Sequence, residues 1–327
     1  MMRVFVTKDG CLRQIDAAPE ALPQDVLWVD LLSPTPDELK PVEQALKIAA
    51  PTREEMQEIE ASSRLYQEDG AAFMTATIVS RAETESPESN AATFIIADGK
   101  LVTLRYSDPL PFTSFPQRAS RQPGQWPTGD MVLAGLLEAI VDRTADILER
   151  VSFEVDGVSK EVFGQRPSTK PLDAGDFLDV LVKLGRKHDL TGKVRESLIS
   201  FTRLLTFLTQ TIEGRPPKDT KDLKGHIKTM SRDVASLADH TTYLANKITY
   251  LQDATLGMVN IEQNRVIKVL AVAGAIFLPP TVLASIWGMN FHFMPELDEA
   301  WGYWAALTLI ALSAIVPIIY FKWRRWF

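Results

Sequence analysis

The sequence predicts an α/β domain at the N-terminus, a long helical stalk, and two transmembrane helices at the C-terminus. Three observations carry this prediction: β-rich runs alternate with capped helices, long apolar patterns follow at helical spacing, and two uncharged apolar runs come last. The expected boundaries are residues 1–128 for the domain, 129–265 for the stalk and 266–327 for the membrane region.

Strand and helix signals alternate in the first domain. Ser33 and Thr35 offer caps for a helix over Pro36–Ile48, and a capping box at Thr52–Glu55 opens a second helix. Asp98-Gly99 is a strong hairpin signal. The Pro-rich segment Pro109–Pro127 is expected to be a connection. The expected strands are Met2–Val6, Val26–Leu31, Ala72–Ser80, Ala92–Ala97 and Lys100–Tyr106.

Long helices are expected after Gly129. Apolar residues recur at 3/4 spacing from Leu133 to Val162 and again from Val180 to Leu208. Breaks follow at Gly164–Gly175 and at Gly214–Pro217. A helix from Lys218 to Trp287 would be about 100 Å long at 1.5 Å per residue. It would carry the stalk and the first span as one element, and the alternative is a break before the bilayer.

Two apolar runs predict the membrane spans. No charged residue occurs from Val269 to Met289 or from Ala300 to Phe321. About 20 helical residues cross a bilayer core, where the backbone must satisfy its own hydrogen bonds. We expect spans at about 267–288 and 301–321, an external loop at 289–300 and a basic tail at 322–327. A soluble protein with two buried core helices is the disfavoured alternative.

Charge predicts the orientation of these spans. No Lys or Arg lies between Lys268 and Lys322, and basic residues flank both spans on their other sides. The positive-inside rule therefore places both termini in the cytoplasm and the loop outside an inner (plasma) membrane. The start of the chain lacks a signal-peptide core, and the lone Cys11 fits a reducing compartment.

Several function classes are disfavoured. The net charge of −7 gives no indication of nucleic-acid binding. The sequence contains no phosphate-binding loop, dinucleotide fingerprint or H-E-x-x-H motif, and its four histidines are scattered. We therefore expect neither an enzyme nor an organic cofactor.

A stripe on the first span is the candidate path for an ion. Because two spans cannot enclose water, a transport function implies a homo-oligomer in the lipid bilayer. The stripe leads to Gly288 and Asn290. Its small members could instead be helix contacts. The residues at 3/4 spacing are Ile267, Leu270, Gly274, Leu278, Thr281 and Ser285.

Neutral oxygens at the mouth suit a hydrated cation. Neither span contains a carboxylate, and Mg²⁺ gives up its water reluctantly. The amide of Asn290 and the carbonyl of Gly288 could hold such an ion, while Leu270 and Leu278 could close the path by dewetting. Cations would be attracted outside by Glu296, Asp298 and Glu299.

The chain resembles the CorA-type magnesium and divalent cation transporters. The matching motifs are Gly288-Met289-Asn290, Asn260–Asn264, Met294–Leu297, Gly302-Tyr303, Tyr320–Trp326, and Thr52-Arg53 with Ile59–Ser62. The resemblance implies a homopentameric funnel with a pore lined by the first span, including Asn264, and a selectivity site at Gly288, Met289 and Asn290. It also implies transport of Mg²⁺, and often Co²⁺ and Ni²⁺, down the electrochemical gradient.

The resemblance further implies gating by cytoplasmic Mg²⁺ at carboxylates between subunits. Glu58 matches the position of one such acid, and Asp233 is the guessed partner. His292 departs from the family, which often has an acid there. Imidazole favours Co²⁺, Ni²⁺ or Zn²⁺, although an exposed substitution without effect is the alternative. A Zn²⁺ or Co²⁺ transporter of the same fold and a pore-less membrane-anchored sensor or scaffold remain open.

Overall fold

The fold was analysed in a computed structural model of the chain. It describes residues 1–15, 23, 25–164, 174–213, 217–289, 292, 294, 299 and 301–324. The chain divides into two compact units. The first unit comprises Met1–Ser168 and Val180–Gln252, and the second comprises Thr169–Asp179 and Asp253–Phe327.

A seven-stranded mixed sheet forms the centre of the N-terminal part, with the strand order β2-β1-β3-β7-β6-β5-β4. Among the described strands, only β3 and β7 pair in parallel, and the other neighbours are antiparallel. The strands are β1 (Met2–Lys8), β2 (Cys11–Ile15), β3 (Val26–Leu32), β4 (Leu65–Glu68), β5 (Ala71–Ser80), β6 (Glu88–Ala97) and β7 (Lys100–Arg105).

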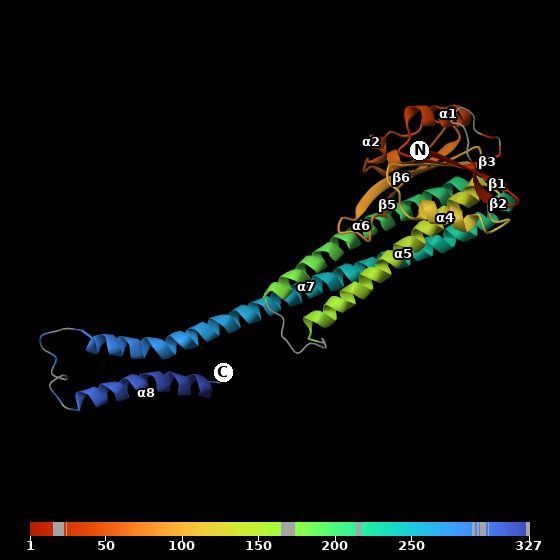
Figure 1. The fold of residues 1–327 in the computed structure, drawn as a ribbon. Helices are drawn as coiled ribbons and strands as arrows, with labels where there is room; N and C mark the ends of the chain where they lie inside the picture. Colours follow the sequence, from red (N-terminus) through yellow and green to blue (C-terminus); the bar gives the residue numbers. More distant parts are fainter. Residues whose placement is uncertain are drawn as a thin grey trace. The chain divides into compact units, whose positions relative to one another are not determined.

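Helices cover both faces of this sheet (Figure 1). One face packs on the short helices α1 (Pro36–Leu46) and α2 (Arg53–Met56), which contribute Val42 and Met56 to a small core. The other face packs on α4 (Pro111–Ala119) and the stalk helices. Because strand side chains alternate between faces, one strand serves both cores: Phe73 belongs to the first and Met74 to the second.

Local signals at the helix starts and hairpins are confirmed. Thr35 and Thr52 each form a complete capping box, and a four-residue helix, α3 (Ala61–Arg64), follows. Asp98 and Gly99 have φ of 50° and 71°, as a tight hairpin between β6 and β7 requires. The expectation of a connection over Pro109–Pro127 was wrong in part, because α4 lies within it. Proline is tolerated in the first turn of α4, because a backbone amide at that position has no helical acceptor to bond with.

A fully buried ion pair joins two strands of the sheet. The Arg105 Nη2 and Nε atoms donate to the two carboxylate oxygens of Asp30 at 2.8 and 2.9 Å, and both side chains are 0% exposed. Thr103 donates to the same carboxylate at 2.8 Å and accepts from the indole of Trp28 at 3.0 Å. Arg105 also forms an ion pair with Asp108, whose side chain is half exposed. These bonds tie β3 to β7 at their parallel pairing.

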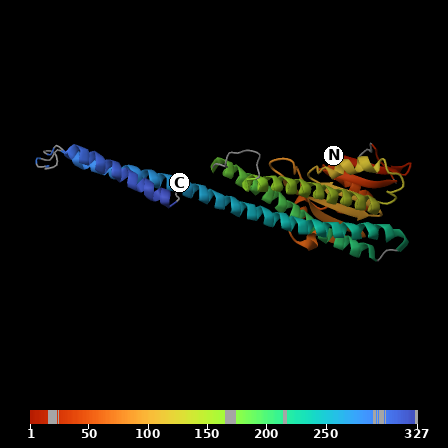
Figure 2. The same ribbon diagram turned by 90° about the horizontal axis from the view of Figure 1, so that it is seen from below.

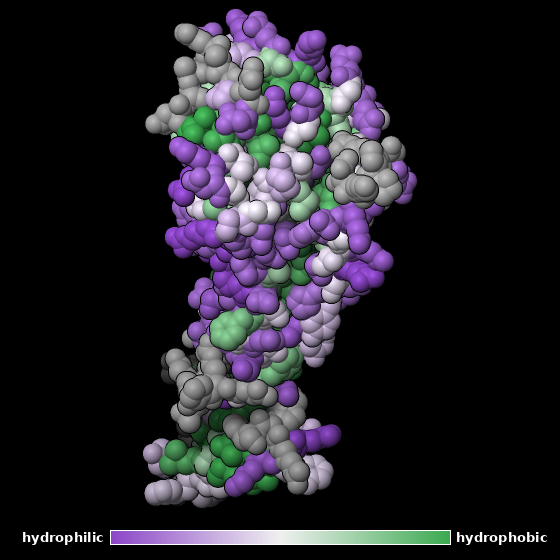
Figure 3. Space-filling model, turned by 90° about the vertical axis from the view of Figure 1, so that its right-hand side faces the viewer, coloured by the Kyte–Doolittle hydropathy of each residue, from purple (hydrophilic) through white to green (hydrophobic). Residues whose placement is uncertain are grey.

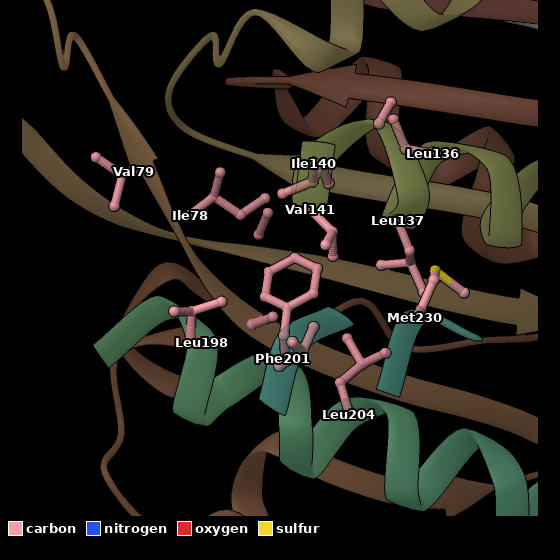
Figure 4. Close-up of a cluster of buried hydrophobic side chains, with 14 of the residues drawn as sticks. Ile78, Val79, Leu136, Leu137, Ile140, Val141, Leu198, Phe201, Leu204 and Met230 are labelled. Atoms are coloured by element: carbon pink, nitrogen blue, oxygen red, sulfur yellow. The ribbon is translucent and has the colours of Figure 1, made fainter. Parts of the chain in front are cut away.

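Three long helices build the stalk: α5 (Gly129–Val162), α6 (Ala174–Glu213) and α7 (Pro217–Trp287). In the first unit, the initial part of α7 lies beside α5 and α6 (Figures 1 and 2). Figure 4 shows Ile78 of β5, Ile140 of α5, Phe201 of α6 and Met230 of α7 converging on one buried cluster. The stalk therefore shares its core with the sheet.

The second unit holds the apolar C-terminal helices. α7 continues unbroken to Trp287 through Pro279 and Pro280, so the alternative of a break before this segment is not observed. α8 (Gly302–Trp323) runs alongside the end of α7 in both ribbon views (Figures 1 and 2). Each helix contains a segment of mean hydropathy 2.1 that is long enough to cross a membrane. By contrast, most of the face drawn in Figure 3 is hydrophilic.

Candidate functional site

The predicted stripe lies along an exposed face of α7. Ile267, Leu270 and Leu278 are 62%, 66% and 66% exposed. Asn264, Gly274, Thr281, Ser285 and Gly288 are exposed as well. A contiguous surface of exposed aliphatic side chains is uncommon on a protein surrounded by water. We therefore expect this face to contact lipid or other protein chains.

The opposite face of α7 is the one covered within the chain. Val272 is 5% exposed, and Ile276, Leu283 and Trp287 are half-buried at the same helical spacing. Residues two positions apart on an α-helix point about 200° apart, so Val272 lies opposite Leu270 and Gly274. The stripe therefore lies on the side of α7 that stays exposed in the single chain. Flanking residues such as Phe277 are also exposed and remain available to lipid.

Polar groups on the stripe are held in defined positions. The Thr281 hydroxyl donates to the Phe277 carbonyl at 2.7 Å, which leaves its oxygen lone pairs available as acceptors. A Cβ on Gly274 would meet nothing within 4 Å, whereas one on Gly288 would lie 3.2 Å from the Ala284 carbonyl. The Gly288 amide donates to that carbonyl at 2.9 Å. The first residue of the tripeptide therefore still takes part in the helical hydrogen-bond pattern.

The structure describes only some residues of the predicted mouth of the ion path. Gly288 and Met289 directly follow α7, and Met289 is 48% exposed. His292 and Glu299 are also exposed. Asn290, Glu296 and Asp298 lie outside the described residues, so their predicted roles stay predictions.

The two candidate regulatory acids lie on different elements. Glu58 is exposed in the turn after α2, and Asp233 is exposed on α7. Within the described part of the chain, no group of three or more His, Cys, Asp or Glu side chains is placed to hold a metal ion. A site built on these carboxylates would therefore need ligands from another copy of the chain, water, or both.

The surroundings of Asp233 contain further acids that the sequence prediction missed. Burial raises the pKa of Asp142 on α5, and the charges of Asp146 and Asp233 add to that rise, whereas Arg118 opposes it. The four-residue spacing of Asp142 and Asp146 was a visible signal in the sequence. The packing face at Val272 and Ile276 was also missed, although it has helical spacing.

Taken together, these features define a class: an integral membrane protein in which one helix belongs both to an α/β-containing unit and to the membrane-spanning pair. A family model described as "CorA-like Mg2+ transporter protein" matches residues 23–325, and the chain belongs to this family. The family consists of transporters rather than enzymes.

Relatives match along the full length. The magnesium transport protein CorA of Wolinella succinogenes is 30% identical over 333 residues, and that of Salmonella typhimurium is 32% identical over 327, each covering 100% of both chains. The solved CorA magnesium transporter from Methanocaldococcus jannaschii has a TM-score of 0.77 at 19% identity, covering 98% of this chain and 97% of that one.

A second solved structure matches over most of the chain. The ZntB cytoplasmic domain from Vibrio parahaemolyticus has a TM-score of 0.60 at 10% identity, covering 79% of this chain and 97% of that domain. Likenesses at such low identity show the fold alone. The predicted fold class is confirmed by the full-length match.

Proposed function

We propose that the protein is a homopentameric channel that carries Mg²⁺ into the cytoplasm through a pore lined by α7. The observation that carries this proposal is the exposed stripe from Asn264 to Gly288, opposite the face on which Val272 is buried. Several copies arranged around an axis would turn their stripes toward one another and leave α8 outside. Gly288, Met289 and Asn290 form the selectivity site of this pore.

The direction of transport follows from charge and potential. Both termini lie in the cytoplasm, and the acidic loop with Glu299 faces outside. A potential that is negative inside drives a divalent ion inward with about 4.6 kcal/mol per 100 mV. The family to which the chain belongs supports Mg²⁺ as the ion. Co²⁺ and Ni²⁺ follow the same path.

Two membrane threonines allow a matched test of the pore-lining face. Thr281 on α7 and Thr308 on α8 each donate their hydroxyl to the carbonyl four residues earlier at 2.7 Å. Only Thr281 lies on the stripe. In proteoliposomes with an imposed potential, Thr281→Val is expected to lower Mg²⁺ flux and Thr308→Val to leave it unchanged. Equal effects of the two variants would contradict the assignment of the pore face.

Selectivity is tested at the tripeptide and at its neighbour. Asn290→Ala is expected to abolish Mg²⁺ flux while the oligomer stays intact, and normal flux would remove Asn290 from the selectivity site.

His292 favours Zn²⁺ or Co²⁺ transport as a second candidate function, because imidazole is a preferred ligand of both. Competition between Mg²⁺, Co²⁺, Ni²⁺ and Zn²⁺ with His292→Glu decides between the candidates. Absence of flux for every ion would favour a scaffold instead.

Gating by cytoplasmic Mg²⁺ rests on Glu58 and Asp233 from adjacent subunits. Exposed carboxylates are hard oxygen ligands of the kind that Mg²⁺ takes, and both side chains are exposed in the single chain. Glu58→Ala is expected to leave flux high when internal Mg²⁺ rises. Glu60→Ala, two residues along the same exposed loop, is the control and should still shut off. Retained shut-off in Glu58→Ala would exclude Glu58 from the sensor.

A further inference from the structure

The most exposed large apolar side chain in the first unit is Ile59, at 90%. It is held on an ordered loop after α2. The Gln57 and Glu58 amides donate to the carbonyls of Glu54 and Glu55 at 3.0 and 3.2 Å. The Arg64 Nε atom donates to the Glu58 carbonyl. An apolar side chain fixed in an outward position has already lost much of the backbone freedom that binding would otherwise remove.

The loop around Ile59 is acidic. Glu54, Glu55, Glu58 and Glu60 are all exposed within seven residues of one another. The nearby cations are turned elsewhere: the Arg53 guanidinium lies 5.2 Å from the centre of the Tyr106 ring, and Arg64 is bonded to the loop backbone and to Thr77. The loop therefore presents one aliphatic side chain surrounded by negative charge.

A groove of complementary character lies elsewhere on the same unit. It has a volume of about 570 Å³ and runs between the end of α6 and the first part of α7. Ile212 and Ile227 form its floor, and both belong to the hydrophobic core. Ala235 also lines it. An aliphatic side chain entering this groove would extend the existing core.

The rim of the groove is basic. Lys224, Lys228 and Arg232 follow one another at four-residue spacing on α7, and among the described residues that line the groove Glu213 is the one acid. None of the three cations forms an ion pair with any residue in the part of the chain that the structure describes. Unpaired cations around an apolar floor favour an acidic partner with an aliphatic tip.

We propose that Ile59 of one copy of the chain docks into the α6–α7 groove of the next copy, with the acidic loop against the basic rim. The proposal rests on the proposed homo-oligomer and names its cytoplasmic contact. The loop and the groove are different surfaces of one chain, so the contact is heterologous, and heterologous contacts form a ring when the rotation between copies closes. A two-fold dimer would instead require one self-complementary surface.

This contact also connects to the proposed sensor. Glu58 directly precedes Ile59, and Asp233 directly follows Arg232 of the rim. Docking therefore places the loop that carries Glu58 against the stretch of the neighbouring α7 that carries Asp233. Any movement between neighbouring subunits would change this contact.

Cysteine cross-linking of the full-length protein tests the docking. The single native cysteine is first removed by Cys11→Ser. Ile59→Cys is then combined with Ser231→Cys, a residue that lines the groove. Oxidation of the detergent-purified protein is expected to give a ladder of covalent multimers that reductant removes. Pairing Ile59→Cys with Phe153→Cys, which is 79% exposed on α5, should give no ladder.

A charge reversal in the double-cysteine protein tests the rim. Lys228→Glu is expected to lower the ladder yield several-fold, because it replaces a rim cation with a charge that repels the acidic loop. Lys221→Glu is the control, because it makes the same change on α7 outside the groove lining. Equal yields for these two variants would contradict the electrostatic part of the proposal.

Light scattering of the same samples separates the possible failures. An intact oligomer without a ladder, or an equal ladder from the Phe153→Cys pair, would overturn the docking contact and leave the pore proposal standing. A single-chain mass would overturn both. A ladder specific to the Ser231→Cys pair supports the docking.

Discussion

Removing one partner of the Asp30–Arg105 pair is expected to destabilise the sheet strongly. Arg105→Met leaves the Asp30 carboxylate at 0% exposure with only the Thr103 hydroxyl as a donor. Breaking a buried pair in this way costs about 3–5 kcal/mol. Asp30→Leu is expected to cost less, because Arg105 keeps Asp108 at 2.7 Å and the Ser107 carbonyl.

The expected change in melting temperature follows from the size of the unit. At about 2–4 °C per kcal/mol for a domain of 150–250 residues, Arg105→Met should lower the melting temperature by about 6–20 °C. The double variant Asp30→Leu with Arg105→Met removes both charges and should lose less than the sum of the two single changes. Thermal unfolding of the detergent-purified full-length protein measures all three.

Two results would refute this reasoning. If Asp30→Leu were more destabilising than Arg105→Met, the remaining contact with Asp108 would not sustain the buried guanidinium. If the double variant lost the full sum, the two charges would act independently despite their bonds of 2.8 and 2.9 Å.

Three further outcomes are expected. Gly135→Ala should lower stability by about 1–3 kcal/mol, as measured by denaturant unfolding, because its Cβ would lie 2.3 Å from the Trp126 ring. Asp142→Asn should raise the melting temperature at neutral pH, where the ionised carboxylate with its raised pKa destabilises the folded state. That gain should disappear as the pH falls through the pKa of Asp142 toward the ordinary value. Gly274→Val should reduce flux with little change in melting temperature, since the position is open in the single chain.

Local signals predicted the fold well where chain neighbours decide the conformation. Thr35, Thr52 and Asp98-Gly99 act within a few residues, and each adopts the predicted geometry. Strands β2 and β4 were missed, although Asp9-Gly10 and Asp69-Gly70 repeat the same dipeptide and have the same positive φ. Those two turns would have identified both hairpins.

Contacts between segments far apart in the chain could not be predicted from the sequence. Asp30 and Arg105 are 75 residues apart, and nothing local marks them as partners. On α7, helical spacing predicted the stripe, but only the burial of Val272 in the structure shows which face is covered. The proposed pore requires other copies of the chain. A single chain therefore shows which residues face outward, but not which residues of other copies they meet.

The two prolines within α7 connect membrane insertion to assembly. Proline has no amide hydrogen, so the carbonyls of Ala275 and Ile276, four residues before Pro279 and Pro280, lack their usual helical donors. Hydrocarbon supplies no substitute, and each unsatisfied group there costs several kcal/mol. A lone copy surrounded by lipid is therefore penalised at this depth, whereas water or a neighbouring helix relieves the penalty. The homo-oligomer proposed above would supply such a neighbour, or a water-filled path, to every copy.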